Sequence, residues 1–205
     1  MRYGMVIDMR RCVGCHACTV ACKQKNATPP GIFWGKVMIK EEGKYPNAKP
    51  VSMPLLCNHC QDAACVNVCP TGASHKTEEG PVLIDHNKCI GCRACIVACP
   101  YDTRSYLKKY DNYYPGKGKT EYERYREGEH TVGTASKCNF CVDRLAEDKD
   151  PLCVQTCIAR ARVFGDLDDP DGEVAKLVLD QNAQPLLPEM GTSPSVYYIQ
   201  GKTLL

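Results

Sequence analysis

Residues 89–100 hold the cysteine arrangement with the clearest chemical meaning in this sequence. They read Cys-Ile-Gly-Cys-Arg-Ala-Cys-Ile-Val-Ala-Cys-Pro, which is a C-x2-C-x2-C-x3-C-P run. Thiolates at this spacing bind cubane iron–sulfur clusters: the first three cysteines bind one cube and the fourth binds a second cube. A run of this kind therefore requires partner cysteines elsewhere in the chain.

Three further groups of four cysteines supply candidate partners, and no cysteine is left over. Sixteen cysteines in 205 residues are far more than soluble proteins ordinarily contain. In sequence order the groups are Cys12, Cys15, Cys18, Cys22; Cys57, Cys60, Cys65, Cys69; Cys89, Cys92, Cys95, Cys99; and Cys138, Cys141, Cys153, Cys157. Because such tight groups favour metal over a framework of disulfides, we expect all sixteen to be metal ligands.

Zinc is the main competing metal. The fourth group, spaced C-x2-C-x11-C-x3-C, could form a structural zinc site by itself. The three-cysteine loops of the first and third groups cannot be divided into C-x2-C pairs without leaving ligands unexplained, which favours iron–sulfur clusters. His16 and His59 lie inside groups that already contain four thiols. We expect them to make hydrogen bonds or partner contacts, although imidazole replaces thiolate in some clusters.

Ligation changes the charge of the chain, whose formal value is +2. Sixteen thiolates add sixteen negative charges and four oxidised cluster cores return eight positive charges, so we expect a charge of about −6. This argues against a nucleic-acid-binding protein.

No apolar run is long enough to span a membrane, and residues 1–8 lack the features of a signal peptide. We expect a cytoplasmic chain, or one exported with a signal-bearing partner and membrane-associated through an anchor subunit.

The elements that must position these cysteines are expected to be short. Residues 3–8 alternate as a strand, and a loop and short helix follow over 12–22. The prolines and glycines of residues 26–50 predict irregular structure with at most a strand at Val37–Ile39, and residues 72–81 predict turns. We expect further strands at 82–85 and 162–166, a helix at 173–181, and an apolar segment at 196–199. Trp34 is expected to pack in the core or at an interface.

The ends of the groups predict how they pair. The second and third groups end in Cys-Pro, whereas the first and fourth do not. We therefore predict an α+β fold of two nested ferredoxin-like units with loop-rich insertions and extensions. Residues 1–25 with 135–170 form the first unit, 50–100 the second and inserted unit, 101–134 a tyrosine-rich docking insert, and 171–205 a C-terminal helix and tail packing on the core or a partner.

Nothing in the sequence points to a site that transforms a substrate. It has no Rossmann or P-loop glycine pattern and no Gly-x-Ser-x-Gly elbow. Catalysis at an open iron requires a group that lacks one cysteine, and every group has four. We expect no catalytic residue in this chain, and therefore a non-catalytic subunit or a carrier.

The four spacings together resemble the four-cluster electron-transfer subunit of molybdopterin oxidoreductases. This is the family of the iron–sulfur subunits of dimethyl sulfoxide, polysulfide, thiosulfate, tetrathionate and arsenate reductases. The resemblance runs from Tyr3 to Ile199 and includes MVIDMRRCVGCHACTVACK, LCNHCQDAACVNVCPTGA, CIGCRACIVACPYD and GDLDDP. It implies four [4Fe-4S] clusters, a large catalytic partner that holds the molybdopterin cofactor, and a membrane anchor or other redox partner.

The resemblance also implies which cysteines share a cluster. The cluster nearest the molybdopterin subunit would use Cys12, Cys15, Cys18 and Cys157; the next Cys22, Cys138, Cys141 and Cys153; the third Cys57, Cys60, Cys65 and Cys99; and the last, facing the anchor, Cys69, Cys89, Cys92 and Cys95. Two other hypotheses stay open here: a freestanding polyferredoxin that carries electrons between soluble enzymes, and a structural zinc protein.

Overall fold

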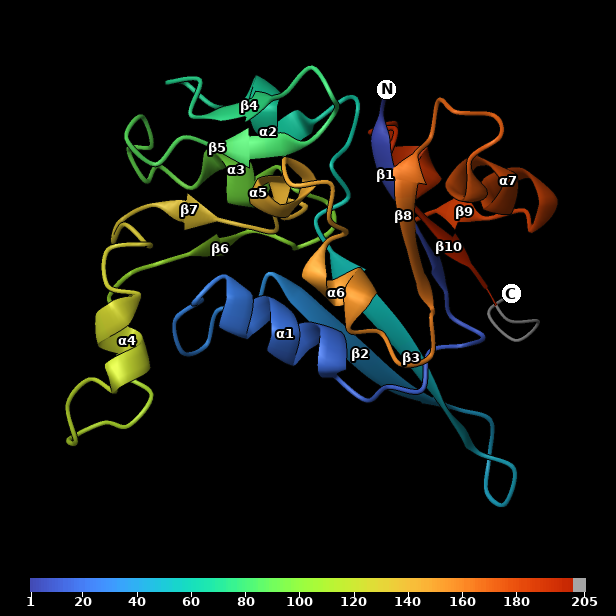
Figure 1. The fold of residues 1–205 in the computed structure, drawn as a ribbon, viewed down its shortest axis with the longest axis horizontal. Helices are drawn as coiled ribbons and strands as arrows, with labels where there is room; N and C mark the ends of the chain where they lie inside the picture. The colour runs from blue at the N-terminus through green and yellow to red at the C-terminus, as the bar shows by residue number, and fades with distance from the viewer. Residues whose placement is uncertain (201–205) are drawn as a thin grey trace.

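A four-stranded sheet joins the two ends of the chain in the computed structural model, which describes residues 1–200 (Figure 1). Its strand order is β8 (Arg162–Asp166), β1 (Tyr3–Asp8), β10 (Val196–Ile199) and β9 (Gln184–Pro185). β1 pairs antiparallel with β8 and parallel with β10. The strands predicted at 3–8 and 162–166 are confirmed, and the apolar segment at 196–199 is a strand of the same sheet.

Both faces of this sheet are buried, which explains the apolar alternation of β1. Val6 packs with Val174 of α7 (Glu173–Asp180) on one face. Met5 and Ile7 pack on the other face, together with Phe140 and neighbouring cysteines. The predicted helix at 173–181 is therefore confirmed. The other face of the sheet packs against cysteine-bearing segments.

A long antiparallel hairpin, β2 (Gly35–Glu42) and β3 (Lys49–Leu56), occupies most of the segment that the sequence predicted to be irregular. The strand allowed at Val37–Ile39 is confirmed as part of β2, whereas the prediction of irregular structure is wrong for the rest of β2 and for the start of β3. Two prolines, Pro50 and Pro54, lie within β3. A two-stranded ribbon has two free edges, so a strand can accommodate prolines without losing hydrogen bonds of a central ladder.

The segments that carry the second and third cysteine groups are short and lie together at the upper left of Figure 1. α2 (Ala64–Asn67) and α3 (Ala94–Val97) are single turns, and β4 (Ser74–Lys76) pairs with β5 (Val82–Ile84) as a hairpin. The strand predicted at 82–85 is confirmed. Residues 74–76 were expected to be turns and instead form its partner strand. Helices of four residues have little stability of their own, so tertiary contacts or ligands must hold them.

Three helices carry or adjoin the other two groups. α1 (Ala17–Lys25) includes Cys18 and Cys22, α5 (Val142–Leu145) begins after Cys141, and α6 (Leu152–Gln155) includes Cys153. α1 packs against α6, as Figure 1 shows near its centre. A 3-10 turn, η1 (Pro188–Met190), precedes β10. Among the helices of residues 1–200 there is none whose length and apolar character would let it cross a membrane.

The tyrosine-rich insert is partly packed on the rest of the chain. It contains β6 (Ser105–Tyr106) and α4 (Glu121–Tyr125), and β6 pairs with β7 (Ala135–Ser136), which directly follows the insert. Tyr122 donates a hydrogen bond to the carbonyl oxygen of Gln24, and Tyr113 donates to that of Thr28 at 2.7 Å. The insert thus covers the carboxyl end of α1, where carbonyl groups lack helical partners.

Candidate metal centres

Three hollows in the protein are each lined by four cysteines drawn from two sequence groups. They contain Cys12, Cys15, Cys18 and Cys157; Cys57, Cys60, Cys65 and Cys99; and Cys69, Cys89, Cys92 and Cys95. We call them the first, third and fourth quartets. Their empty volumes, open mouths included, are similar at about 350, 340 and 330 Å³. These are the same sets of cysteines that the sequence resemblance implied.

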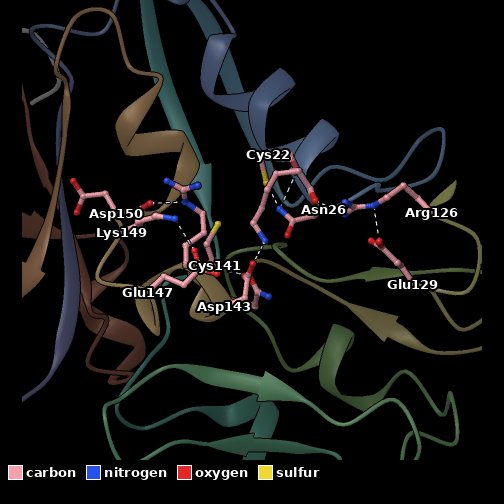
Figure 2. Close-up of polar contacts among 12 residues, drawn as sticks. Cys22, Asn26, Arg126, Glu129, Cys141, Asp143, Glu147, Lys149 and Asp150 are labelled. Atoms are coloured by element: carbon pink, nitrogen blue, oxygen red, sulfur yellow. Dashed lines mark hydrogen bonds and ion pairs between the residues drawn. The ribbon is translucent and has the colours of Figure 1, made fainter. Parts of the chain in front are cut away.

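The four remaining cysteines also lie together, and we call them the second quartet: Cys22, Cys138, Cys141 and Cys153. Burial raises the pKa of the Cys138 thiol well above its ordinary value, and the nearby Cys22, Cys153 and Cys141 raise it further. Burial likewise raises the pKa of Cys22 to about 12. Figure 2 shows Cys22 and Cys141 on facing segments, with Asn26 beside Cys22. None of the sixteen cysteines forms a disulfide.

Polar contacts around the second quartet join three separate segments (Figure 2). Lys25 at the end of α1 forms an ion pair with Asp143 of α5. Arg126 of the insert donates to the carbonyl oxygen of Lys25 and forms an ion pair with Glu129. These contacts tie α1, α5 and the insert together over the buried thiols.

The first and fourth quartets are held by loops of matching backbone shape. Gly14 and Gly91 both have φ of +69°, and the residues that follow the second cysteine, His16 and Arg93, have φ of 58° and 63°. Left-handed backbone is accessible to glycine without steric cost. A Cβ atom at Gly91 would also lie 2.1 Å from the carbonyl oxygen of Gly133. Glycine is therefore required here both by conformation and by space.

Hydrogen bonds reach several of the cysteine sulfur atoms. The backbone N–H of Ser74 donates to Cys69 Sγ at 3.3 Å, and that of Ala161 donates to Cys157 Sγ at 3.3 Å. Burial acts to raise the pKa of Cys69, but hydrogen bonds from Ser74 and Thr71 outweigh it and lower the pKa below its ordinary value. Such donors stabilise the thiolate, which is the form that binds metal.

A buried arginine lies between the first and second quartets. Arg162 donates through Nη2 to Cys18 Sγ at 3.6 Å and through Nη1 to Cys153 Sγ at 3.8 Å. These sulfur atoms belong to different quartets, so one guanidinium contacts both.

A second buried arginine lies between the third and fourth quartets. Arg104 donates through Nη2 to Cys65 Sγ at 2.8 Å and through Nη1 to Ser74 Oγ at 2.9 Å. Cys65 lines the hollow of the third quartet and Ser74 lines that of the fourth.

Two stacked aromatic rings connect the second and third quartets. The His59 and Phe140 rings lie with their centroids 3.7 Å apart. His59 follows Cys57 by two residues, and Phe140 follows Cys138 by two residues. His59 is fully buried, and its Nδ1 accepts a hydrogen bond from the backbone N–H of Val82 at 3.0 Å. Burial lowers its pKa well below the ordinary value, so the imidazole is neutral. It makes a hydrogen bond, as the sequence led us to expect.

The quartets therefore follow one another in a row, from the first to the fourth. Only Cys15 and Cys92 among the sixteen cysteines are exposed, and they belong to the first and fourth quartets. The exposed side chains of Val13 and Ile90 lie two residues before them. The row thus has one exposed thiol at each end and no exposed thiol in its two middle quartets.

The donor set fits [4Fe-4S] clusters. Four thiolates are the usual ligands of such a cluster, and each quartet supplies four thiols with no disulfide among them. The three hollows have similar volumes, as expected of sites that bind the same group. Within residues 1–200, no three His, Cys, Asp or Glu side chains are arranged to hold a single metal ion.

Sequence reasoning did not identify Arg104, Arg162 or Phe140. Each arginine follows the last cysteine of a group by five residues, a spacing that carries no meaning until both are seen to be buried. Phe140 had a weak signal, because Cys-Asn-Phe-Cys and Cys-Asn-His-Cys are related tetrapeptides. Trp34 packs against the core and donates to Ser136 Oγ at 3.2 Å, in agreement with its predicted packing role.

Comparison with known proteins relates these quartets to a protein family. Two family profiles, both described as "4Fe-4S dicluster domain", match the chain, one over residues 49–132 and 118–167 and the other over residues 11–73. The chain is 40% identical to the arsenate respiratory reductase iron–sulfur subunit of a Shewanella species, over 98% of this chain and 97% of that protein.

Two further relatives are also subunits of reductases. The selenate reductase subunit from Mesobacillus selenatarsenatis is 42% identical, over 95% of this chain and 70% of the relative. The tetrathionate reductase subunit from Salmonella typhimurium is 39% identical, over 97% of this chain and 72% of the relative. The similarity thus extends along nearly the whole sequence and includes all four cysteine groups.

Proposed function

This chain belongs to the family of iron–sulfur subunits of dimethyl sulfoxide, selenate, arsenate and tetrathionate reductases, and we propose that it relays single electrons through four [4Fe-4S] clusters. One partner would be a molybdopterin-containing catalytic subunit. The other would be a membrane anchor that exchanges electrons with quinone, or another redox protein. The chain itself would transform no substrate.

The gathering of sixteen thiols into four quartets is the observation that supports this proposal. Each quartet would bind one cluster, and a bound [4Fe-4S] cluster accepts or donates one electron at a time. The protein's own side chains supply the thiolate ligands, exclude water from the middle quartets and fix the distances between them. The pairing of groups favours two nested ferredoxin-like units, one formed by the first and second quartets and the other by the third and fourth.

The two accessible ends support contact with two partners. The catalytic subunit would cover the first quartet, as the family resemblance implies, and the electron partner would cover the fourth. Apolar side chains near exposed thiols suit such contacts because the buried centre of a protein interface is depleted of charge. A relay needs an entrance and an exit, and the row of quartets offers one at each end.

Cys95 and Cys99 provide a direct test, since they are four residues apart but are assigned to different clusters. We expect Cys95→Ser to lose or convert only the fourth cluster and Cys99→Ser only the third. Electron paramagnetic resonance (EPR) of each reduced variant, purified with its complex, would show two different missing signals. Damage to the same cluster by both substitutions, or four intact clusters in either, would contradict the ligand assignment.

The alternative hypotheses differ in metal content and in partners. The proposal requires about sixteen iron atoms per chain, four in each cluster. A zinc-loaded and colourless preparation would contradict it. A relay subunit should also be isolated from its native cells with a large catalytic partner, whereas a freestanding carrier would be isolated alone.

A further inference from the structure

Two arginines are among the most deeply buried charged residues of the protein. Arg162 is 4% exposed and Arg104 is 5% exposed. Within residues 1–200, neither forms an ion pair with a carboxylate. An arginine cannot lose its proton in a protein, and a buried charge without a counter-charge is strongly destabilising. Their counter-charge must therefore come from the sulfur atoms that they face.

The surroundings of the two guanidinium groups match. Arg162 contacts Cys18 and Cys153, and Arg104 contacts Cys65. Burial acts to lower the pKa of Arg104, but the nearby thiols Cys65, Cys57 and Cys95 raise it above the ordinary value. Arg104 also donates to Ser74 Oγ, and the backbone N–H of Ser74 donates to Cys69 Sγ of the fourth quartet. Each arginine thus faces thiols of two different quartets.

The thiols that lie near these arginines occupy equivalent positions. Cys18, Cys65, Cys95 and Cys153 are each the third cysteine of their sequence group. The arginines are equivalent as well: Arg104 follows Cys99 and Arg162 follows Cys157 by five residues, and each of these cysteines ends the later group of its proposed unit. The same place in each half of the molecule is therefore occupied by matching residues. Both halves have a positive charge at that place.

A fixed positive charge beside a redox centre favours the state that carries more negative charge. Reduction adds an electron to the centre, so a nearby guanidinium makes reduction easier and raises the potential. The effect is strong at these two sites because both groups are buried and salt screens them little. A guanidinium between two centres acts on both.

We propose that Arg162 and Arg104 are matched electrostatic bridges, each of which raises the reduction potentials of the two clusters that adjoin it. Arg162 would act on the clusters of the first and second quartets, and Arg104 on those of the third and fourth. Both are positioning residues that tune the centres without binding iron. The inference rests on the proposed four-cluster relay.

The test is an EPR-monitored redox titration of the full-length, cluster-loaded chain and of its Arg162→Met and Arg104→Met variants. Methionine keeps an unbranched side chain and removes the charge. We expect Arg162→Met to lower the potentials of two of the four clusters and Arg104→Met to lower those of the other two. The expected shift is about tenfold in the equilibrium constant of reduction, which is about 59 mV for a one-electron couple.

Matched controls come from two exposed cations. Arg11 and Lys88 each precede the first cysteine of their group, Cys12 and Cys89, and both are exposed. Arg11→Met and Lys88→Met remove the same charge close to the same centres, but in water, where the interaction is weakened. We expect each control to shift the equilibrium constant by less than about threefold.

Several outcomes would overturn the inference. Full iron content with unchanged potentials would do so, as would a shift of the same two clusters by both variants. Arg162→Lys keeps the charge and should retain most of the wild-type potential; a fall as large as that of the methionine variant would show that charge is not the cause. If the methionine variant does not fold, Arg162→Gln replaces it in the same comparison.

The proposed function and this inference fail in different ways. A wild-type chain that contains fewer than four clusters contradicts the relay itself. A wild-type chain with four clusters whose potentials do not respond to either arginine contradicts only the role of the two bridges.

Discussion

Gly91 shows how strongly a single residue constrains a cysteine loop. It lies between Cys89 and Cys92, has φ of +69°, and leaves no space for a Cβ atom beside the carbonyl oxygen of Gly133. Gly133 also has a positive φ, of 83°, but a Cβ atom there would meet nothing within 4 Å. The two glycines therefore separate the cost of the backbone conformation from the cost of a steric clash.

We predict that Gly91→Ala is much more harmful than Gly133→Ala. Placing alanine in left-handed backbone costs about 1–2 kcal/mol, which is all that Gly133→Ala should cost. Gly91→Ala adds overpacking of about 1–3 kcal/mol and should also displace ligands of the fourth quartet. Thermal unfolding and iron analysis of the loaded proteins measure both effects. Equal losses of stability and iron in the two variants would disprove the steric argument.

At the scale of elements, the insert has both a structural face and an exposed face. Its inner side chains contact the carboxyl end of α1. α4 begins with a capping box in which Thr120 and Glu123 satisfy each other's backbone groups, which stabilises the first turn of this helix. Its outer surface carries Tyr114 and Tyr125, which are 59% and 84% exposed. The exposed face is the one available for the proposed docking role.

We predict that the double substitution Tyr114→Ala and Tyr125→Ala weakens association with the partner subunit and leaves the iron content unchanged. Removal of an interface tyrosine commonly costs about 2 kcal/mol when the residue is a hot spot. Tyr45→Ala is the matched control, because Tyr45 is 95% exposed but lies on the β2–β3 turn outside the insert. Association measured by surface plasmon resonance would contradict the docking role if the double variant and the control behaved alike.

At the scale of the whole molecule, the metal centres take the place of a large apolar core. Within residues 57–100 both helices have four residues, which is too few to be stable without ligands or packing. The buried guanidinium groups of Arg104 and Arg162 further reduce the free energy of unfolding of the metal-free chain, because a buried charge without a counter-charge is destabilising. Burial raises the pKa of many of the thiols, including that of Cys60 to about 11. These thiols are therefore protonated without metal and cannot balance the two cations.

We predict that removal of iron by a chelator, under anaerobic conditions, unfolds most of the chain. Metal binding supplies the folding free energy of small metal-dependent domains, and residues 57–100 have no other source of comparable size. Hydrogen exchange over residues 57–100 should reach the rate seen in denaturant, and reconstitution with iron and sulfide should restore protection. A metal-free chain that keeps the protection of the loaded protein would contradict this account.

The kind of chemistry was readable from the sequence because ligand spacing is a local property. Cysteines three or four residues apart must lie near one another in any fold, so the C-x2-C-x2-C-x3-C runs indicate a metal cluster without further information. Strands with a clear period, such as residues 3–8 and 162–166, were equally accessible. The hairpin over residues 35–56 was not, because its prolines are tolerated only at free edges, which local sequence does not reveal.

Only the tertiary structure decided what lies between the quartets. Arg162 is separated from Cys18 by 144 residues, and the stacked rings of His59 and Phe140 come from different sequence groups. An arginine is usually exposed, and its effect on a redox centre depends on burial and on the charges that it faces. Those are properties of the assembled surroundings, whereas the identity of a thiolate ligand is already present in the unfolded chain.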